Sequence, residues 1–437
     1  MNYQKSLNRL LNLEAAPKFG LERMQSLVAH LGHPEQSYQI LHVAGTNGKG
    51  STCAFLEAIL EKADIPRGRY TSPHLQCVRE RILINGALIS EQEFCKVENI
   101  VNEMCLRLPE ITTFFERMTA MALLAFQRAG VKVAILEVGL GGRLDGTNVV
   151  QPSVCGLTRI DIDHTQILGD TLAKIAVEKA GIIKTGVPVV SDAQNAEAAQ
   201  VIKAYAEQMS APLCQIGADI QIELCEDEIC VFYQGKIILP KCKPALLGSY
   251  QIHNAAVAVG MIELSGLVPD LNVRRLGVES AKWPGRYETV SENPWVILDG
   301  AHNPAGMRAL LETIKSDKRF VNLPMTLVVG MTEGHDVKEM ASIWQAALPQ
   351  LEKIIVTQAR VPRALPPEEI MQAFLNSPLE KSGRILSISD SRVAIERAMS
   401  IAFDKNGFVL VAGSLYLVGE VRGIFFDMAR NEKSPDY

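Results

Sequence analysis

The sequence has no feature that would place the protein in or across a membrane. Its 437 residues contain no stretch approaching the ~20 consecutive apolar residues of a membrane helix. The opening residues, Met1 to Ser6, carry no apolar core of signal-peptide length. The formal net charge of −5 gives no reason to expect nucleic acid or an anionic membrane as a partner. We therefore expect a cytoplasmic protein.

Cysteine pairs are missing as well. The cysteines show no CxxC spacing and are odd in number, which indicates buried thiols in a reducing compartment. Internal repeats and low-complexity tracts are also absent. With 47% hydrophobic and 21% charged residues, the composition is ordinary for a soluble globular protein with a sizeable core. All nine cysteines precede position 243, which suggests that the last third of the chain is a separate unit. They are Cys53, Cys77, Cys95, Cys105, Cys155, Cys214, Cys225, Cys230 and Cys242.

What the sequence does contain is a long alternation of predicted helices and strands. Helices separate strands that are expected at 38–43, 67–71, 133–136, 154–158 and 187–191. This order predicts a parallel sheet covered on both faces, followed by a small β layer between about 212 and 240. The alternation restarts after Trp283–Arg286, a candidate linker, and includes a helix expected at 337–348. We predict an α/β protein, with a P-loop parallel-sheet ATPase domain at 1–290 and a smaller Rossmann-like domain at 291–437.

The chain is organised around the segment Val43-Ala44-Gly45-Thr46-Asn47-Gly48-Lys49-Gly50-Ser51-Thr52. An apolar strand precedes it and an amphipathic helix follows. This arrangement suits phosphate binding, because glycines let backbone N–H groups approach an anion and the helix N-terminus adds a positive field. Lys49 would reach the outer phosphates. The pattern G-x-x-x-x-G-K-[ST] requires a glycine at 43 and a hydroxyl at 50, where this chain has Val43 and Gly50. We interpret the segment as a variant nucleotide site, the alternative being a chance cluster of glycines.

Two polar residues are expected at the same sheet edge as this loop. Glu137 ends a buried strand, and His164 follows the next one. Ligands of open α/β sheets sit outside the carboxyl ends of the strands, so Glu137 can hold Mg²⁺ there. A carboxylate capping a neighbouring turn is the other interpretation. Mg²⁺ prefers oxygen ligands, so the residues alone leave the role of His164 open between metal ligand and structural histidine.

Two further segments have both structural and functional interpretations. The sequence around Lys179 is typical of a surface lysine near a helix end, where the helix dipole favours a cation. Thr113-Phe114-Phe115-Glu116 combines a hydroxyl and a carboxylate with two aromatic rings at a helix start. Adjacent phenylalanines usually belong to a core, but one of two consecutive helical positions tends to point outward. One ring is therefore a candidate for stacking on a flat ligand.

In the second domain, polar residues again follow predicted strands. Asp299 and His302 lie between a strand and a helix, and Ser414 and Tyr416 occupy a similar position late in the chain. We expect these residues to face a cleft between the domains. Arg286, at the linker, could turn toward phosphates as a charge stabiliser.

Together these segments resemble the Mur ligase family, and within it the folylpolyglutamate synthase/dihydrofolate synthase branch. The motifs occur in the family's order and span most of the chain. They are Gly45–Ser51, Thr71-Ser72-Pro73-His74-Leu75, Thr113–Glu116, Glu137–Asp145, Asp163-His164-Thr165, Glu178–Ile182, Trp283–Arg286 and Asp299–Pro304.

The resemblance implies ATP-dependent amide formation between a pteridine-linked carboxylate and L-glutamate. ATP phosphorylates the carboxylate of dihydropteroate or a folate, and the glutamate amine then attacks the acyl phosphate. Because a carboxylate attacking a triphosphate brings two anions together, cations must screen both. The resemblance therefore also implies two Mg²⁺ ions, with ATP as co-substrate. We expect a monomer.

The resemblance also implies a role for each motif residue. Lys49, Lys179 and His302 would be catalytic, and Lys179 would be carbamylated, which turns a cation into an anionic oxygen ligand for Mg²⁺. His302, Ser414 and Tyr416 are candidates for holding the glutamate carboxylates. The remaining roles fall into four groups. Gly48, Lys49, Gly50 and Ser51 would hold the ATP phosphates; Asn254, Arg286 and Asp299 would contact ATP from the far side of the cleft; Ser72, Glu137, His164 and Lys179 would coordinate the metal; and Thr113, Phe114, Phe115, Glu116, Leu144, Asp145 and Gly146 would line the pterin pocket.

Two departures from the family pattern bear on the substrate. Gly146 stands where bifunctional members often carry alanine, and Thr158–Ile162 stands where small residues are commoner. Because of Gly146, a folylpolyglutamate synthase without activity on dihydropteroate remains an alternative. The second would affect packing near the metal. A P-loop kinase or nucleotide switch is an alternative from another class, but it predicts a complete Walker pattern. A non-enzymatic nucleotide-binding module conflicts with so many polar residues at strand ends.

Overall fold

The computed structural model describes residues 2–13, 20–347, 350–375 and 377–433. The chain divides into two compact units. The first comprises 1–245 and 250–282, and the second comprises 246–249 and 283–437. The main boundary thus lies between Lys282 and Trp283, somewhat before the expected position at 290/291. Leu348, the end of the helix expected at 337–348, lies outside the described residues.

The main sheet of the first unit has the strand order β4-β3-β2-β5-β1-β6-β7-β8. From β2 to β8 all neighbours run parallel, whereas β3 pairs antiparallel with both β2 and β4. The predicted parallel sheet is therefore confirmed, with an antiparallel hairpin added at one edge. The strands are β1 (Gln39–Ala44), β2 (Arg67–Tyr70), β3 (Ile82–Ile84), β4 (Ala87–Leu88), β5 (Val133–Glu137), β6 (Val154–Leu157), β7 (Val189–Ser191) and β8 (Leu213–Gln215).

Helices cover both faces of this sheet, which is why its central strands are almost entirely buried. On one face, α5 packs on β2, since a side chain at Gly68 would collide with Phe126. On the other face, α9 packs on β6, since a side chain at Gly156 would collide with Met261. The helices of this unit are α1 (Tyr3–Leu11), α2 (Glu22–His30), α3 (Lys49–Lys62), α4 (Glu91–Cys105), α5 (Phe114–Ala129), α6 (Thr165–Leu168), α7 (Leu172–Ala180), α8 (Ala196–Gln208), α9 (Ser249–Ser265) and α10 (Leu271–Val278).

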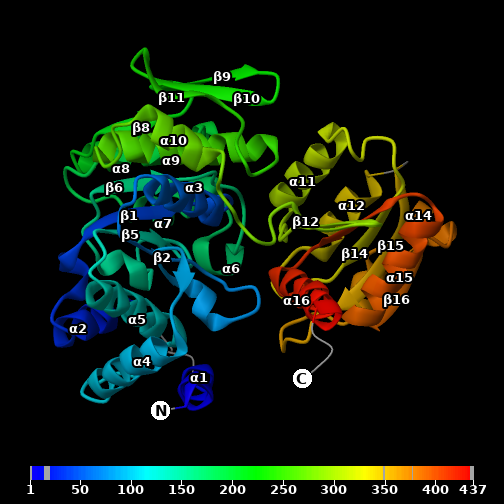
Figure 1. The fold of residues 1–437 in the computed structure, drawn as a ribbon, viewed down its shortest axis with the longest axis horizontal. Helices are drawn as coiled ribbons and strands as arrows, with labels where there is room; N and C mark the ends of the chain where they lie inside the picture. The colour runs from blue at the N-terminus through cyan, green and yellow to red at the C-terminus, as the bar shows by residue number, and fades with distance from the viewer. Residues whose placement is uncertain (1, 14–19, 348–349, 376, 434–437) are drawn as a thin grey trace. The chain divides into compact units, whose positions relative to one another are not determined.

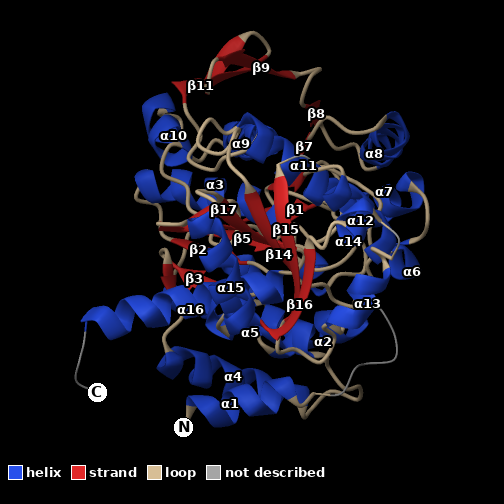
Figure 2. Ribbon diagram, turned by 90° about the vertical axis from the view of Figure 1, so that its right-hand side faces the viewer, coloured by secondary structure: helices blue, strands red, loops and turns tan. Residues whose placement is uncertain are grey.

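The predicted small β layer is an antiparallel sheet of order β11-β10-β9. Its strands are β9 (Ile220–Cys225), β10 (Glu228–Tyr233) and β11 (Lys236–Cys242). Figures 1 and 2 both show α9 and α10 between this layer and the main sheet. Arg274 of α10 donates to the Ile238 carbonyl of β11 at 3.1 Å, which ties the layer to the helices.

The second unit is built around a sheet of order β12-β13-β17-β14-β15-β16 (Figure 1). All its neighbours run parallel except β12, which forms an antiparallel edge strand. Side chains of α11, α12 and α13 share one apolar core with one face of the sheet. Helix α15 packs against strands β14 to β17. The elements are β12 (Glu288–Glu292), β13 (Trp295–Leu298), α11 (Pro304–Ser316), β14 (Met325–Val329), α12 (Val337–Gln345), β15 (Leu351–Gln358), α13 (Pro367–Gln372), α14 (Pro378–Lys381), β16 (Ile385–Asp390), α15 (Ser391–Asp404), β17 (Phe408–Ala412) and α16 (Leu415–Lys433).

Candidate active site

Three neighbouring strands of the first unit end side by side and carry the candidate residues. The order β5-β1-β6 places Glu137, the Gly45–Lys49 loop and the 158–164 segment at one edge of the sheet. Val43 pairs with Glu137, and Ala44 pairs with Leu157. This is the edge at which open α/β sheets bind ligands.

The loop that follows β1 has the backbone of a phosphate-binding turn. Gly48 adopts a left-handed conformation, with φ of 92°, and α3 begins at the next residue, Lys49. The helix therefore begins within the loop, and its first N–H groups lie there. Gly50 follows in the first turn, and the Ser51 side chain is buried there. A helix N-terminus preceded by glycines is suited to hold an anion.

Two lysines converge on the carbonyl oxygen of Gly45. Lys49 Nζ donates to it at 3.0 Å and also to the Thr46 carbonyl at 3.0 Å. Lys179 Nζ, from the end of α7, donates to the same Gly45 oxygen at 2.8 Å. Lys179 is 4% exposed, so the expectation of a surface lysine is wrong. The sequence around Lys179 looks like an ordinary exposed helix end. The packing of α7 against the loop nevertheless buries this side chain.

The buried position changes the acid–base chemistry of Lys179. Burial first, and the positive charge of Lys49 second, lower the pKa of Lys179 to about 7. Nearby carboxylates, among them Asp163 and Asp145, act in the opposite direction but more weakly. The Lys179 amine is therefore substantially neutral near pH 7, and a neutral amine is the form that acts as a nucleophile.

The 158–161 segment supports the phosphate loop. The backbone N–H groups of Thr46 and Asn47 both donate to the Arg159 carbonyl, at 2.9 and 3.2 Å. The Thr46 hydroxyl donates to the Asp161 carbonyl at 3.0 Å, and the Asn47 amide donates to the Asp161 carboxylate at 3.1 Å. A side chain at Gly45 would collide with the Thr158 hydroxyl. The unusual Thr158–Ile162 segment thus holds the loop, a role that the sequence analysis missed because these residues are distant from the loop along the chain.

Glu137 and Ser72 lie together at the neighbouring strand ends. The Ser72 N–H donates to Glu137 Oε2 at 2.9 Å, and the Glu137 side chain is 5% exposed. His164 is exposed and lies at the start of α6, with φ of 49°. Among the described residues, no group of three or more His, Cys, Asp or Glu side chains is arranged to hold a metal ion. The predicted metal ligands do not form such a group, because only Glu137 and His164 among them are of these residue types. The other two predicted ligands are Ser72 and Lys179. The carboxylate and hydroxyl oxygens of Glu137 and Ser72 fit Mg²⁺, whereas the imidazole of His164 is a less usual ligand.

Asp145 fixes the glycine-rich loop that follows Glu137. Its carboxylate accepts hydrogen bonds from the N–H groups of Gly139, Leu140 and Thr147 and from the Thr147 hydroxyl. Burial nevertheless raises the pKa of Asp145. Because the Thr147 hydroxyl donates to Asp145, it accepts from His42 Nε2, at 2.9 Å. Burial lowers the pKa of His42 to about 3, so this imidazole is neutral. Asp145 was predicted to line the pterin pocket, but its side chain is bonded within the loop.

The Thr113–Glu116 segment is used mainly to begin α5. The Thr113 hydroxyl accepts from the Glu116 N–H at 3.1 Å, and the Glu116 carboxylate accepts from the Thr113 N–H at 2.7 Å, which is a capping box. Glu116 also forms an ion pair with Arg23 of α2 at 2.9 Å. The spacing Thr-x-x-Glu was the signal for this structural role, and the sequence analysis missed it. The polar members of the segment are thus occupied within the fold.

The two phenylalanines of this segment lie in different surroundings, and both are partly buried. Phe115 lies 6.1 Å from Tyr70, ring centre to ring centre, and close to Gly139 and Gly146. The Arg81 guanidinium lies 5.1 Å from the centre of the Phe114 ring. A side chain Cβ at Gly146 would contact the Phe115 ring at 3.6 Å, an ordinary van der Waals distance. Leu144, also partly buried, belongs to the same loop.

Asn254 lies beside the phosphate loop, within the first unit. A Cβ at Gly48 would be 2.1 Å from Asn254 Oδ1. The prediction that Asn254 approaches ATP from across the cleft is therefore wrong, because α9 carries it back to the main sheet. Its amide nitrogen donates to Gln251 Oε1 at 2.9 Å, and Gln251 is fully buried.

The second unit has its own group of candidates at the carboxyl edge of its sheet. Asp299 is buried and accepts from the N–H groups of Tyr287 and Ala301, both at 2.8 Å. Burial raises the pKa of Asp299, and the charge of Arg286 opposes this shift. His302 lies two residues before α11, and its Nδ1 is 2.9 Å from the Gly300 carbonyl oxygen. Ser414 is buried, and its hydroxyl accepts from the N–H of Tyr416.

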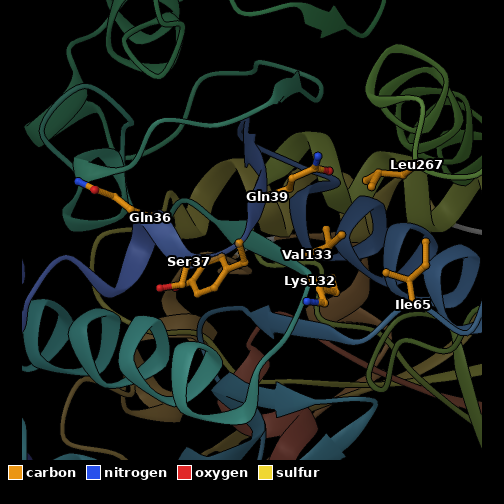
Figure 3. A pocket seen from close by; sticks show the side chains of 8 residues that line it. Gln36, Ser37, Gln39, Ile65, Lys132, Val133 and Leu267 are labelled. Carbon is orange, nitrogen blue, oxygen red and sulfur yellow. The ribbon is translucent and has the colours of Figure 1, made fainter.

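A hollow elsewhere in the first unit is distinct from these groups. Figure 3 shows it at the amino-terminal ends of β1 and β5, where Gln39 and Val133 line it with Lys132. Its volume is about 560 Å³. The phosphate loop lies at the opposite ends of the same strands, so this hollow is not part of the candidate site.

In the described part of the chain, no helix is long and apolar enough to cross a membrane.

Two family descriptions match the chain. The Mur ligase middle domain matches residues 43–262, and the Mur ligase glutamate ligase domain matches residues 285–415. The chain belongs to the Mur ligase family. The predicted family is thereby confirmed, and the α/β architecture with it.

Individual relatives of this Mur ligase support the predicted branch. The dihydrofolate synthase/folylpolyglutamate synthase of Bacillus subtilis is 36% identical over 423 residues, which cover 94% of this chain and 96% of that protein. A probable bifunctional folylpolyglutamate synthase/dihydropteroate synthase of Haloferax volcanii is 34% identical over 443 residues. That match covers 97% of this chain but only half of the longer relative.

Solved structures of related enzymes have the same fold over nearly the whole chain. E. coli FolC in complex with DHPP and ADP superposes with a TM-score of 0.88 at 31% identity, covering 98% of this chain and 99% of that one. A bifunctional folylpolyglutamate synthase/dihydrofolate synthase with Mn, AMPPNP and L-glutamate bound gives 0.87 at 30% identity, covering 98% of both chains.

Proposed function

We propose that the protein is an ATP-dependent ligase that joins L-glutamate to dihydropteroate and to folates through an acyl phosphate. The observation that carries this proposal is the convergence of Lys49 and Lys179 on Gly45, one strand away from the buried Glu137. A cation, a nucleophilic amine and a carboxylate at one strand edge meet the needs of a reaction between two anions. The names of the full-length relatives indicate the same reaction.

The chemistry proceeds in two steps with balanced atoms. A carboxylate oxygen of the acceptor attacks the γ-phosphorus of ATP, and ADP leaves. The glutamate amine then attacks the acyl carbon, loses a proton and expels inorganic phosphate, which retains the acceptor oxygen. Lys49, with the N–H groups of Gly48, Gly50 and Ser51, would bind the phosphates and stabilise the charge that develops during transfer. Asn254, Arg286 and Asp299 are the proposed further contacts for ATP.

The divalent metal would be held by Ser72, Glu137, His164 and Lys179. When bound, two Mg²⁺ ions would neutralise phosphate charge and polarise the reacting oxygens. Lys179 would take part as a carbamate. Its neutral amine would attack CO₂ and lose a proton, leaving an anionic group in place of an amine. Burial and the neighbouring Lys49 favour this reaction, because they lower the pKa of Lys179 to about 7.

The acceptor would bind against the loop after Glu137. Phe115 and Phe114 would contact the pterin, together with Leu144 and the backbone at Gly146. Thr113, Glu116 and Asp145 would shape this pocket indirectly, by fixing α5 and the loop. His302 is the proposed catalytic residue of the second unit, near the glutamate. The active form would be a cytoplasmic monomer.

A folylpolyglutamate synthase without dihydropteroate activity is the second candidate. It is favoured by Gly146, the position where bifunctional members often carry alanine. The space beside Phe115 accepts a methyl group without collision, so the glycine is not required by packing at this point.

One assay separates the candidates. The purified protein is given ATP, Mg²⁺ and L-glutamate with either dihydropteroate or a reduced folate, and ADP release is followed. Turnover with both acceptors is expected. Turnover with the folate alone would leave only the polyglutamylating activity. ADP release that does not depend on an amino acid would instead favour a kinase or nucleotide switch.

A further inference from the structure

Three loops meet at the carboxyl edge of the second sheet. They follow β13, β17 and β14, which are neighbours in that order. The Gly413 N–H, after β17, donates to the Ala301 carbonyl, after β13, at 2.8 Å. A side chain at Gly413 would lie 2.7 Å from the Gly330 carbonyl oxygen, after β14. The three loops are therefore in direct contact, and each precedes a helix: α11, α16 and α12.

Two histidines face each other across this junction. His302 comes from the first loop and His335 from the third, and their ring centres are 5.2 Å apart with an interplanar angle of 66°. His302 Nδ1 lies 2.9 Å from the Gly300 carbonyl oxygen. Because a carbonyl can only accept, Nδ1 is the ring nitrogen that donates in this hydrogen bond. Both rings are only partly covered by protein.

The helices that follow the two histidines are held by contacts of other residues. The α11–α12 pair is already joined by an ion pair between Arg308 and Glu339 at 2.7 Å. The Asp336 carboxylate, next to His335, caps α12 by accepting from the Glu339 N–H at 2.9 Å. An imidazole N–H at the amino-terminal end of a helix attracts a carboxylate, because it donates a hydrogen bond and the helix dipole favours negative charge.

We propose that His335, opposite His302, binds a carboxylate of the incoming L-glutamate and so helps to select this amino acid. The inference rests on the proposed function and adds a binding residue to it. His335 contributes hydrogen bonding to the bound amino acid, while Arg286 and Asp299 lie on the β13 side of the same edge. Replacing His335 should therefore weaken glutamate binding and leave nucleotide binding unchanged.

The test compares three variants of the full chain. His335→Ala removes the proposed contact, and His335→Lys supplies another hydrogen-bond donor in its place. Lys338→Ala, an exposed position in the first turn of α12, the helix that follows His335, is the matched control. Initial rates of ADP release are measured with Mg²⁺ and a reduced folate, first varying L-glutamate and then varying ATP. Thermal unfolding of each variant shows whether the fold is retained.

The expected result is a KM for L-glutamate raised about tenfold or more in His335→Ala, as for loss of a hydrogen bond to a charged group. The KM for ATP should be unchanged, His335→Lys should recover most of the glutamate affinity, and Lys338→Ala should match the unsubstituted protein. An unchanged KM for glutamate, or equal changes in both KM values, would overturn the inference while the proposed function stands. Absence of glutamate-dependent turnover in the unsubstituted protein would overturn both.

Discussion

Lys49 and Lys179 donate to the same acceptor, the carbonyl oxygen of Gly45, at 3.0 and 2.8 Å. Two ammonium groups at one oxygen would repel each other, and the buried one loses its proton more readily. The result is a pair with different chemistry: Lys49 is placed to contact phosphates, and Lys179 is an amine suited to reaction. Two lysine side chains of different chemistry are thus held against the same turn of the backbone, at Gly45.

The first prediction concerns the Lys179 side chain. Lys179→Ala should nearly abolish glutamate-dependent ADP release, and added bicarbonate should not rescue it, because no amine remains to carry the carbamate. Lys174→Ala, on the exposed side of the same helix, should behave like the unsubstituted protein. If Lys179→Ala keeps the original rate, the proposed role of this residue is wrong.

The second prediction concerns the pH dependence of carbamylation. The neutral amine reacts with CO₂, and the pKa of Lys179 is lowered to about 7, so the reactive form predominates above that pH and disappears below it. With ¹³C-labelled bicarbonate, a carbamate carbon signal should grow as pH rises through about 7 and fade as pH falls. Lys179→Ala should lack this signal. A signal that grows only near the ordinary lysine pKa of 10.5 would contradict the buried, shifted amine.

The third prediction concerns the phosphate loop. Lys49→Ala should lower kcat/KM by on the order of 10²-fold or more, as for removal of a preorganised charge stabiliser. Lys62→Ala, at the far end of the same helix and exposed, is the control. Equal rates for both variants would show that the loop does not hold the reacting phosphates.

The fourth prediction concerns the buried relay from His42 through Thr147 to Asp145. Thr147→Val removes the hydroxyl that links them, so that the buried His42 Nε2 loses its acceptor and the buried Asp145 carboxylate loses one of its donors. We expect the free energy of unfolding to fall by about 2–4 kcal/mol, measured by urea denaturation. Thr147→Ser keeps the hydroxyl and should lose much less. A larger loss in Thr147→Ser than in Thr147→Val would mean that packing of the Thr147 methyl group, rather than the relay, stabilises the loop.

Much of the fold followed from local sequence signals. Alternating apolar and amphipathic segments predicted the parallel strands and the small β layer that follows them. Antiparallel edge strand β12 and the pairing order of the sheets were not predicted, because strand order depends on contacts between distant segments.

The site shows the same division. The phosphate loop was visible as a contiguous segment, and Glu137 and His164 were expected at the same sheet edge because each stands at or just past the end of a predicted strand. The burial of Lys179 could not be read from its neighbours, since it results from α7 packing against a loop more than a hundred residues earlier. The placement of Asn254 was wrong for a similar reason. The position of α9 on the main sheet is a tertiary contact that local patterns do not encode.

The account depends most directly on the claim that ATP activates a carboxylate of the acceptor. That claim is tested by following an oxygen atom. A folate whose reacting carboxylate is labelled with ¹⁸O is converted with ATP, Mg²⁺ and L-glutamate, and the released inorganic phosphate is analysed by mass spectrometry. The account predicts that one labelled oxygen is transferred to phosphate for each amide formed. Amide formation that leaves the phosphate unlabelled would contradict it.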